Sequence, residues 1–223
     1  MTILIGGPGD QILPGVNNEP NTLYGDAVEL GGHGETGGND TLIGGNNSTN
    51  TLYGDAENMF GPSTGGNDTL IGGVGGNDTL IGGVSGTNTL YGDAFSASGP
   101  VTGGGDRLVS AANTTDHMWG DFDSIGGPAS GGADIFAFRQ DNGIDFINDF
   151  HLLEGDKIEI GTLPAQAAEK IPDKAKDHIP LLEFSDLNIQ EADGNSVIQF
   201  DANDSITVVG VTDLTEFDFL FVV

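Results

Sequence analysis

The chain has 223 residues, 38 of them glycine, with no cysteine and a formal net charge of −28. This charge excludes nucleic acids and anionic membrane surfaces as expected partners, since both carry the same sign, and the lack of cysteine excludes disulfides and thiolate metal sites. A hard cation would compensate the acids, because no Lys or Arg precedes Arg107. No apolar run approaches the ~18 residues that a membrane-spanning helix needs.

One nine-residue string repeats letter for letter in the N-terminal part of the chain. Gly-Gly-Asn-Asp-Thr-Leu-Ile-Gly-Gly occupies residues 37–45, 65–73 and 75–83. A related unit, Asn-Thr-Leu-Tyr-Gly-Asp-Ala, occupies residues 21–27, 50–56 and 88–94. Acidic, glycine-rich chains are often disordered, but the fixed offset between acid and aliphatic residue favours a small folded unit that is stacked many times.

Each repeat has one Asp or Asn directly before its Thr-Leu pair or the equivalent, which we call the marker. The markers are Asp10, Asn21, Asp40, Asn50, Asp68, Asp78, Asn88, Asp106, Asp116 and Asp134. Two residues after them come the apolar side chains of Ile12, Leu23, Leu42, Leu52, Leu70, Leu80, Leu90, Leu108, Met118 and Phe136. Because alternate residues of a strand share one side, this offset predicts short strands around a thin core, in an all-β, parallel β-roll (a β-solenoid).

The spacing of the markers predicts how they are distributed over the roll. Steps near 10 residues mostly alternate with steps near 18. If successive markers lie on opposite edges, one edge carries Asp10, Asp40, Asp68, Asn88 and Asp116, and the other carries Asn21, Asn50, Asp78, Asp106 and Asp134. We favour the interpretation that each long step is a half-turn plus a protruding loop. The alternative is a complete extra rung, with residues 56–64 as a strand paired inside the stack.

The turn residues predict a metal site that uses only oxygen ligands. Glycine pairs leave backbone carbonyls uncovered, and an Asp beside them adds a carboxylate, which together suit Ca²⁺. Nitrogen and sulfur ligands are missing, which disfavours Zn²⁺ and Cu²⁺. One turn offers too few oxygens, so we expect ions to be shared between successive turns.

A second acid follows several markers by five residues, namely Asp26, Asp55, Asp93 and Asp121. These second acids complete the metal sites in our interpretation, because an Asn marker supplies no charge. The alternative is that they are ordinary turn residues whose carboxylates face solvent.

The last part of the chain differs in composition, since five of the six Lys and Arg residues follow residue 134. Strand-like segments lie at 135–138, 145–147, 157–160, 196–200 and 205–209. A short helix interrupted by Pro172 is expected within 164–177. We therefore expect a calcium-binding roll over residues 1–134 and a β-rich segment over 135–223 that caps its last rung.

The repeats resemble the RTX (repeat-in-toxin) calcium-binding family, whose nonapeptide is Gly-Gly-x-Gly-x-Asp-x-U-x, with U a large aliphatic residue. The Asp position holds Asp40, Asp68 and Asp78, the third Gly position holds Gly38, Gly66 and Gly76, and the U position holds Leu42, Leu70 and Leu80. The resemblance implies several Ca²⁺ ions between turns. Their expected ligands are all ten markers, the four second acids, and Gly38, Gly66, Gly76 and Gly104.

The C-terminal part resembles the segment that closes the roll in serralysin-type exoproteins of this family. The similar segments are residues 132–138, 142–150, 155–158 and 218–221. In that family the C-terminal end directs type I secretion without cleavage. The resemblance implies an extracellular protein that folds on binding Ca²⁺, with the type I secretion machinery as a partner. The start of the chain agrees with this expectation, because it lacks the basic region of a signal peptide.

The sequence contains no recognisable catalytic motif. The four histidines do not form His-Glu-x-x-His, and the segment around Ser85 departs from Gly-x-Ser-x-Gly. We therefore expect a secreted calcium-binding protein without a catalytic site of its own. Two alternatives remain: the targeting and folding module of an exoenzyme (a protease, lipase or alginate epimerase), or a calcium-dependent adhesin or surface-layer element whose partner is a glycan or a cell surface.

Overall fold

The structure, a computed structural model, describes residues 1–31, 35–60, 63–139, 141–162 and 181–223. It is nearly all β, as predicted, with short 3₁₀ helices at Phe184–Asp186 and Glu216–Asp218. The helix expected within 164–177 lies outside the described residues. Among the described residues, none forms a helix long and apolar enough to cross a membrane.

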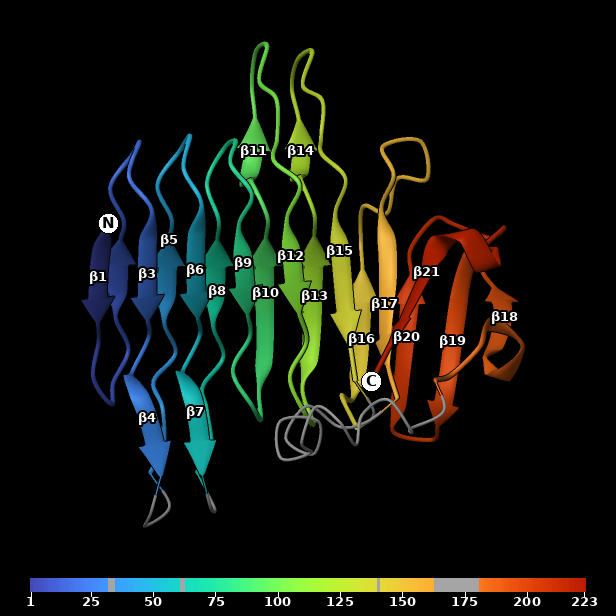
Figure 1. Cartoon of the computed structure of the whole chain (residues 1–223), viewed down its shortest axis with the longest axis horizontal. Coiled ribbons are helices and arrows are strands. Elements are labelled where there is room, and N and C mark those ends of the chain that lie inside the picture. The colour runs from blue at the N-terminus through green and yellow to red at the C-terminus, as the bar shows by residue number, and fades with distance from the viewer. Residues whose placement is uncertain (32–34, 61–62, 140, 163–180) are drawn as a thin grey trace.

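Two long sheets, here named A and B, face each other along the molecule (Figure 1). Sheet A contains, in spatial order, β1 (Thr2–Ile5), β3 (Asn21–Tyr24), β6 (Asn50–Tyr53), β9 (Thr79–Ile81), β12 (Arg107–Val109), β15 (Ile135–Phe138), β17 (Lys157–Gly161) and β21 (Phe219–Val222). Sheet B contains β2 (Ile12–Pro14), β5 (Thr41–Ile43), β8 (Thr69–Ile71), β10 (Thr87–Tyr91), β13 (Thr115–Trp119), β16 (Ile144–Ile147), β20 (Asp204–Val208), β19 (Asn195–Asp201) and β18 (Asn188–Ala192).

The chain alternates between these two sheets, strand by strand, as far as β17, and the pairing is parallel except in β18–β19–β20. We call the pair of sheets the stack, and one strand of each sheet a rung. Parallel pairing of equivalent repeat units is compatible with a β-roll. Both sheets continue across residue 134, since β15 pairs with β12 on one side and with β17 on the other.

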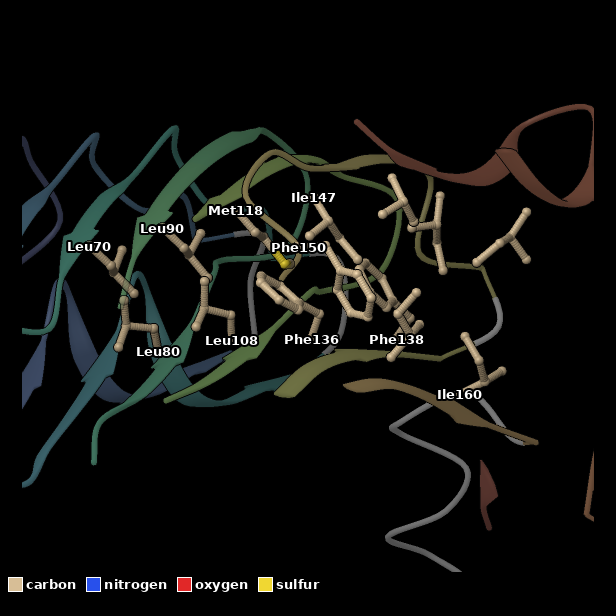
Figure 2. Close-up of a cluster of buried hydrophobic side chains, with 14 of the residues drawn as sticks. Leu70, Leu80, Leu90, Leu108, Met118, Phe136, Phe138, Ile147, Phe150 and Ile160 are labelled. Atoms are coloured by element: carbon tan, nitrogen blue, oxygen red, sulfur yellow. The ribbon is translucent and has the colours of Figure 1, made fainter. Parts of the chain in front are cut away.

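The core is a thin double row of side chains between the sheets (Figure 2). Nine of the ten apolar residues predicted from the markers are fully buried: Leu23, Leu42, Leu52, Leu70, Leu80, Leu90, Leu108, Met118 and Phe136. They lie in register on neighbouring strands, as Leu42 does with Leu70. The repeat spacing therefore predicted the core because it follows the two-residue alternation of a strand.

The first marker is one residue out of frame. Ile12 is 70% exposed, and Leu13 takes the position that pairs with Leu42. The N–H of Gln11 donates to Asp40, so Gln11 holds the marker position and Asp10 does not. The prediction for Asp10 and Ile12 was wrong because β2 starts one residue later than the Asp-x-apolar pattern suggests.

The remaining markers occupy the two edges predicted for them. At the first edge the strands of sheet A end and those of sheet B begin, and at the second edge the reverse holds. Asn21 pairs with Asn50 in sheet A, and Asn88 pairs with Asp116 in sheet B. The alternation of short and long steps was therefore a correct guide to the sides of the stack.

The long steps protrude from the stack, which favours the loop interpretation over the extra rung. Residues 56–60 do form a strand, β7 (Ala56–Phe60), but it pairs with β4 (Ala27–Gly31) in a separate two-stranded sheet at the first edge. The other two long steps form β11 (Ala94–Ala97) and β14 (Phe122–Ile125), which pair at the second edge. Figure 1 shows the two hairpin pairs on opposite sides of the stack.

Truncation in the middle of the core provides a test of this packing. We expect Leu80→Ala to lower the free energy of unfolding by about 2–5 kcal/mol, because it removes buried apolar surface and leaves a cavity. Ile12→Ala, at an exposed position, is the control and should cost less than about 0.5 kcal/mol. Urea unfolding in one buffer measures both, and equal losses would contradict the assignment of Leu80 to the core.

Candidate metal sites

Each long step carries two buried aspartates, one on either side of its hairpin. We call such a segment a long turn; its first Asp is a second acid and its last Asp is a marker. The four pairs are Asp26 with Asp40, Asp55 with Asp68, Asp93 with Asp106, and Asp121 with Asp134. All eight residues are at most 3% exposed. The alternative that the second acids are solvent-facing turn residues is therefore wrong.

In each long-turn carboxylate, one oxygen accepts a hydrogen bond from a backbone N–H group. Oδ1 of Asp68 accepts a hydrogen bond from the N–H of Asp40 at 2.8 Å, so each marker is joined to the rung before it. The second acids instead accept from glycines of their own turn: the N–H groups of Gly38, Gly66 and Gly104 donate to Asp26, Asp55 and Asp93. These three glycines therefore contact the second acids through their N–H groups.

The other oxygen of most of these carboxylates is buried without a partner. Oδ2 has no hydrogen-bond partner among the described residues in Asp40, Asp55, Asp68, Asp78, Asp93, Asp106 and Asp134. An ionised carboxylate in such a place costs several kcal/mol unless it is paired. Each of these oxygens therefore needs either a proton or a cation.

Glycines leave space in front of the unpartnered oxygens. A Cβ atom at Gly83 would lie 1.7 Å from Oδ2 of Asp55 and 2.9 Å from Oδ2 of Asp68, so both oxygens face the same small space. At the second edge, a Cβ at Gly103 would lie 1.9 Å from Oδ2 of Asp93. The glycine repeats are thus required where a side chain would fill the space between two carboxylates.

Burial raises the pKa of these acids, and neighbouring like charges raise it further. At the first edge, burial and then the charge of Asp68 raise the pKa of Asp55 to about 8. At the second edge, burial and then the charge of Asp121 raise the pKa of Asp134 to about 10. Burial, with added repulsion from Asp93 and Asp78, raises the pKa of Asp106 to about 9. Neighbouring carboxylates on each edge therefore repel one another when they are ionised.

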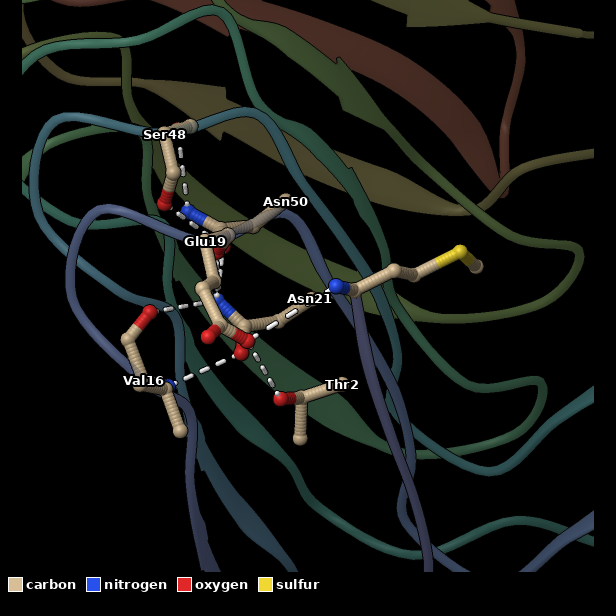
Figure 3. Close-up of polar contacts among 7 residues, drawn as sticks. Thr2, Val16, Glu19, Asn21, Ser48 and Asn50 are labelled. Carbon is tan, nitrogen blue, oxygen red and sulfur yellow. Dashed lines mark hydrogen bonds and ion pairs between the residues drawn. The ribbon is translucent and has the colours of Figure 1, made fainter.

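The markers of the short steps other than Asp78 have a different environment, because protein groups satisfy their side chains. Asn21 donates to Asn50 and accepts from Val16, and Figure 3 shows this amide network at the N-terminal end. Asn88 accepts from Asp68 and donates to Oδ1 of Asp116. In this structure Asn21, Asn50 and Asn88 therefore act as hydrogen-bonding turn residues, and we leave them out of the ligand set proposed below.

Two further acids leave the ligand set for separate reasons. Both oxygens of Asp116 accept hydrogen bonds, Oδ1 from Asn88 and Oδ2 from the Thr114 hydroxyl at 3.0 Å. Asp10 is exposed and accepts from Asn39. Gly76 lies in a short turn with a φ of +114°, so it is not equivalent to Gly38 and Gly66 although the surrounding letters are the same.

The second edge ends in a cluster that contains a histidine. One ligand atom each of Asp121, His151 and Glu154 lies within 4.8 Å of the others. Nδ1 of His151 is 3.1 Å from Oε2 of Glu154, and both side chains are partly exposed. Nitrogen is therefore available at this end of the row, although the oxygen-only pattern holds for the long turns before it.

The pattern of acids continues beyond the markers that sequence reasoning identified. Oδ1 of Asp156 accepts from the N–H of Asp134, and Asp149 accepts from the N–H groups of Gly120 and Asp121. A signal was present in the sequence, since Asp156 stands two residues before the buried Ile158.

Neither a scan for known protein families nor a search of curated proteins finds a match to this chain.

The raised pKa values predict how the cation-free stack responds to pH. An unfolded Asp has a pKa near ~3.9, whereas folding raises the pKa of Asp40 to about 6 and that of Asp134 to about 10. The folded state binds more protons, so the contribution of these groups is fully present below about pH 4 and is lost as the pH rises through their folded pKa values. We expect cation-depleted protein to unfold at a lower urea concentration at pH 8 than at pH 5. Greater stability at pH 8 would contradict the burial of these carboxylates.

Proposed function

We propose that this chain is a calcium-binding protein of the RTX type that folds when Ca²⁺ fills sites between its rungs. The observation that carries the proposal is the row of buried carboxylate oxygens that lack a partner. Their donor set consists of oxygens, and the glycine spaces in front of them admit an ion but no side chain. Hard oxygen ligands of mixed charge fit Ca²⁺ better than the transition metals.

The proposed sites form one group on each edge. The first-edge ligands are Asp26, Asp40, Asp55 and Asp68. The second-edge ligands are Asp78, Asp93, Asp106, Asp121 and Asp134. Ions between neighbouring long turns would neutralise the repulsion that raises the pKa of these acids, and would join rungs whose hydrophobic contact is one side chain per strand.

Binding would be coupled to folding, because the carboxylates come together only in the stack. Each filled site stabilises the folded state by RT ln(1 + [L]/Kd), and extracellular calcium modules bind with a Kd of ~10⁻⁴–10⁻³ M. The low calcium concentration of the cytosol would leave the chain unfolded, and the higher concentration outside the cell would fold it. Secretion through a type I system and an extracellular location are parts of this proposal that rest on the resemblance of the repeats and of the C-terminal segments. The proposed lack of a catalytic site rests on the motifs that the sequence does not contain.

Calcium titration of a matched set of variants tests the ligands. Asp55→Asn and Asp106→Asn should each weaken calcium binding about tenfold or more, a loss of about 1.4 kcal/mol, because each removes a buried charge. Asp10→Asn is the control, since Asp10 is exposed and outside the proposed sites. Isothermal titration and far-ultraviolet circular dichroism follow binding and folding together. The same β content in chelator as in millimolar calcium would contradict the proposal.

Filling the space between carboxylates provides a second test that keeps every acid. Gly83→Ala places a methyl group where Asp55 and Asp68 meet, so we expect the first-edge sites to lose calcium while the second-edge sites keep it. Gly9→Ala is the control, since nothing lies within 4 Å of its Cβ position. The number of bound ions per chain is the measurement, and an unchanged number in Gly83→Ala would count against ions in this space.

A further inference from the structure

A small cavity lies at the first edge, near the C-terminal end of the stack, outside the long turns. Its volume is about 370 Å³, and the residues that line it include Asp141, Asp201, Asn203 and Asp204. It lies between the turn that joins β15 to β16 and the tight turn of the β19–β20 hairpin, whose strands Figure 1 shows at this end. The cavity is thus where the terminal hairpin meets the stack.

One carboxylate in this cavity is only half satisfied. Asp204 is 5% exposed, and its Oδ2 accepts from the N–H of Asp141 at 2.9 Å. Its Oδ1 is buried and has no hydrogen-bond partner among the described residues. Burial, together with the charges of Asp201 and Asp141, raises the pKa of Asp204. Like the unpartnered oxygens of the long-turn acids, Oδ1 of Asp204 therefore needs a proton or a cation.

The pairing within the β19–β20 hairpin is a second, independent observation that indicates a cation site. Asp201 and Asp204 are direct cross-strand partners in the β19–β20 pairing, and like charges directly opposite each other destabilise a hairpin. No Lys, Arg or His is among the described residues that line the cavity. The Asp201 carboxylate accepts one hydrogen bond, from the N–H of Asn203, but no cationic side chain among the described lining residues relieves the repulsion, and the available ligand atoms are oxygens.

This cavity is separate from the long-turn sites. Between them, at the first edge, hydroxyl groups take the place of a cation: Thr114 donates to Asp116, and Ser110 donates to Asp145. No long turn contributes to the cavity lining. An ion here would have its own ligands and its own role.

We propose that the cavity is a further calcium site, with the buried Asp204 as its fixed carboxylate ligand and the exposed Asp201 and Asp141 as the carboxylates that close on the ion. The ion ties the β19–β20 hairpin to the turn at 141–143, beside the backbone hydrogen bond from Ser205 to Gly143. Calcium therefore controls the docking of the C-terminal strands of sheet B as well as the stacking of the repeats. The ligand class is a hard divalent cation with oxygen-only coordination.

Substitution of Asp201 gives effects of opposite sign with and without the ion. In chelator at pH 5, where protons neutralise the long-turn acids in place of calcium, Asp201→Asn removes the repulsion from Asp204, so we expect slower hydrogen exchange in residues 195–208. In millimolar calcium, the same change removes a ligand, so exchange there should become faster than in wild type. A purely structural role would shift exchange in the same direction in both conditions.

The number of bound ions completes the test. Asp201→Asn and Asp204→Asn should each bind one calcium ion fewer than wild type, while protection of β6 and β9 stays unchanged. The control is Asp193→Asn, in the turn of the neighbouring β18–β19 hairpin and outside the cavity lining. Wild-type ion number in Asp201→Asn and Asp204→Asn would overturn this inference alone, whereas wild-type protein that binds no calcium would overturn the proposed function as well.

Discussion

The stack depends on how its buried carboxylates are neutralised. After the first rung, each rung of the repeat region contributes one fully buried apolar side chain from each sheet, such as Leu52 and Leu70, and such a side chain stabilises by roughly 1.5–3 kcal/mol. A core this thin leaves little margin against the repulsion of buried acids such as Asp55 and Asp68, whose Oδ2 atoms face the same small space. The charges therefore determine whether the rungs stay together, while the hydrophobic pattern determines their register.

The long turns and the short turns of the stack differ in how their polar side chains are satisfied. Long turns bring pairs of acids into the interior and leave one oxygen of most of them unpartnered. Short turns are closed by amides, hydroxyls and left-handed residues such as Asn47, with φ of 55°, and Asn113, with φ of 59°. Around residues 72–87 both turns are short, and beyond this point the long turns move from the first edge to the second. The acids are therefore gathered on opposite edges in the two halves of the stack.

Apart from the first marker, the sequence predicted the core and the two edges of the repeat region because these follow from spacing alone. It did not predict which turns need a cation, because two segments with the same amino-acid sequence adopt different conformations. The string at 65–73 ends a long turn, whereas the same string at 75–83 begins within a short one, where Gly75 and Gly76 both have positive φ. What differs is the preceding chain: a protruding hairpin leads into the first, and strand β8 leads directly into the second. Ligand roles were therefore set by tertiary context beyond the nonapeptide.

The choice between Asn and Asp at a short-turn marker follows from the same physics. An Asn there needs no counter-charge and can donate to the next rung, as Nδ2 of Asn50 does to Oδ1 of Asp78. Where an acid stands at such a marker, other groups compensate it: the Thr114 hydroxyl donates to Asp116. Asp78 is the exception, since its Oδ2 has no partner among the described residues, and it lies close enough to Asp93 for that charge to raise its pKa. Asp78 therefore belongs with the acids of the neighbouring long turn, at the rung where the acidic edge changes sides.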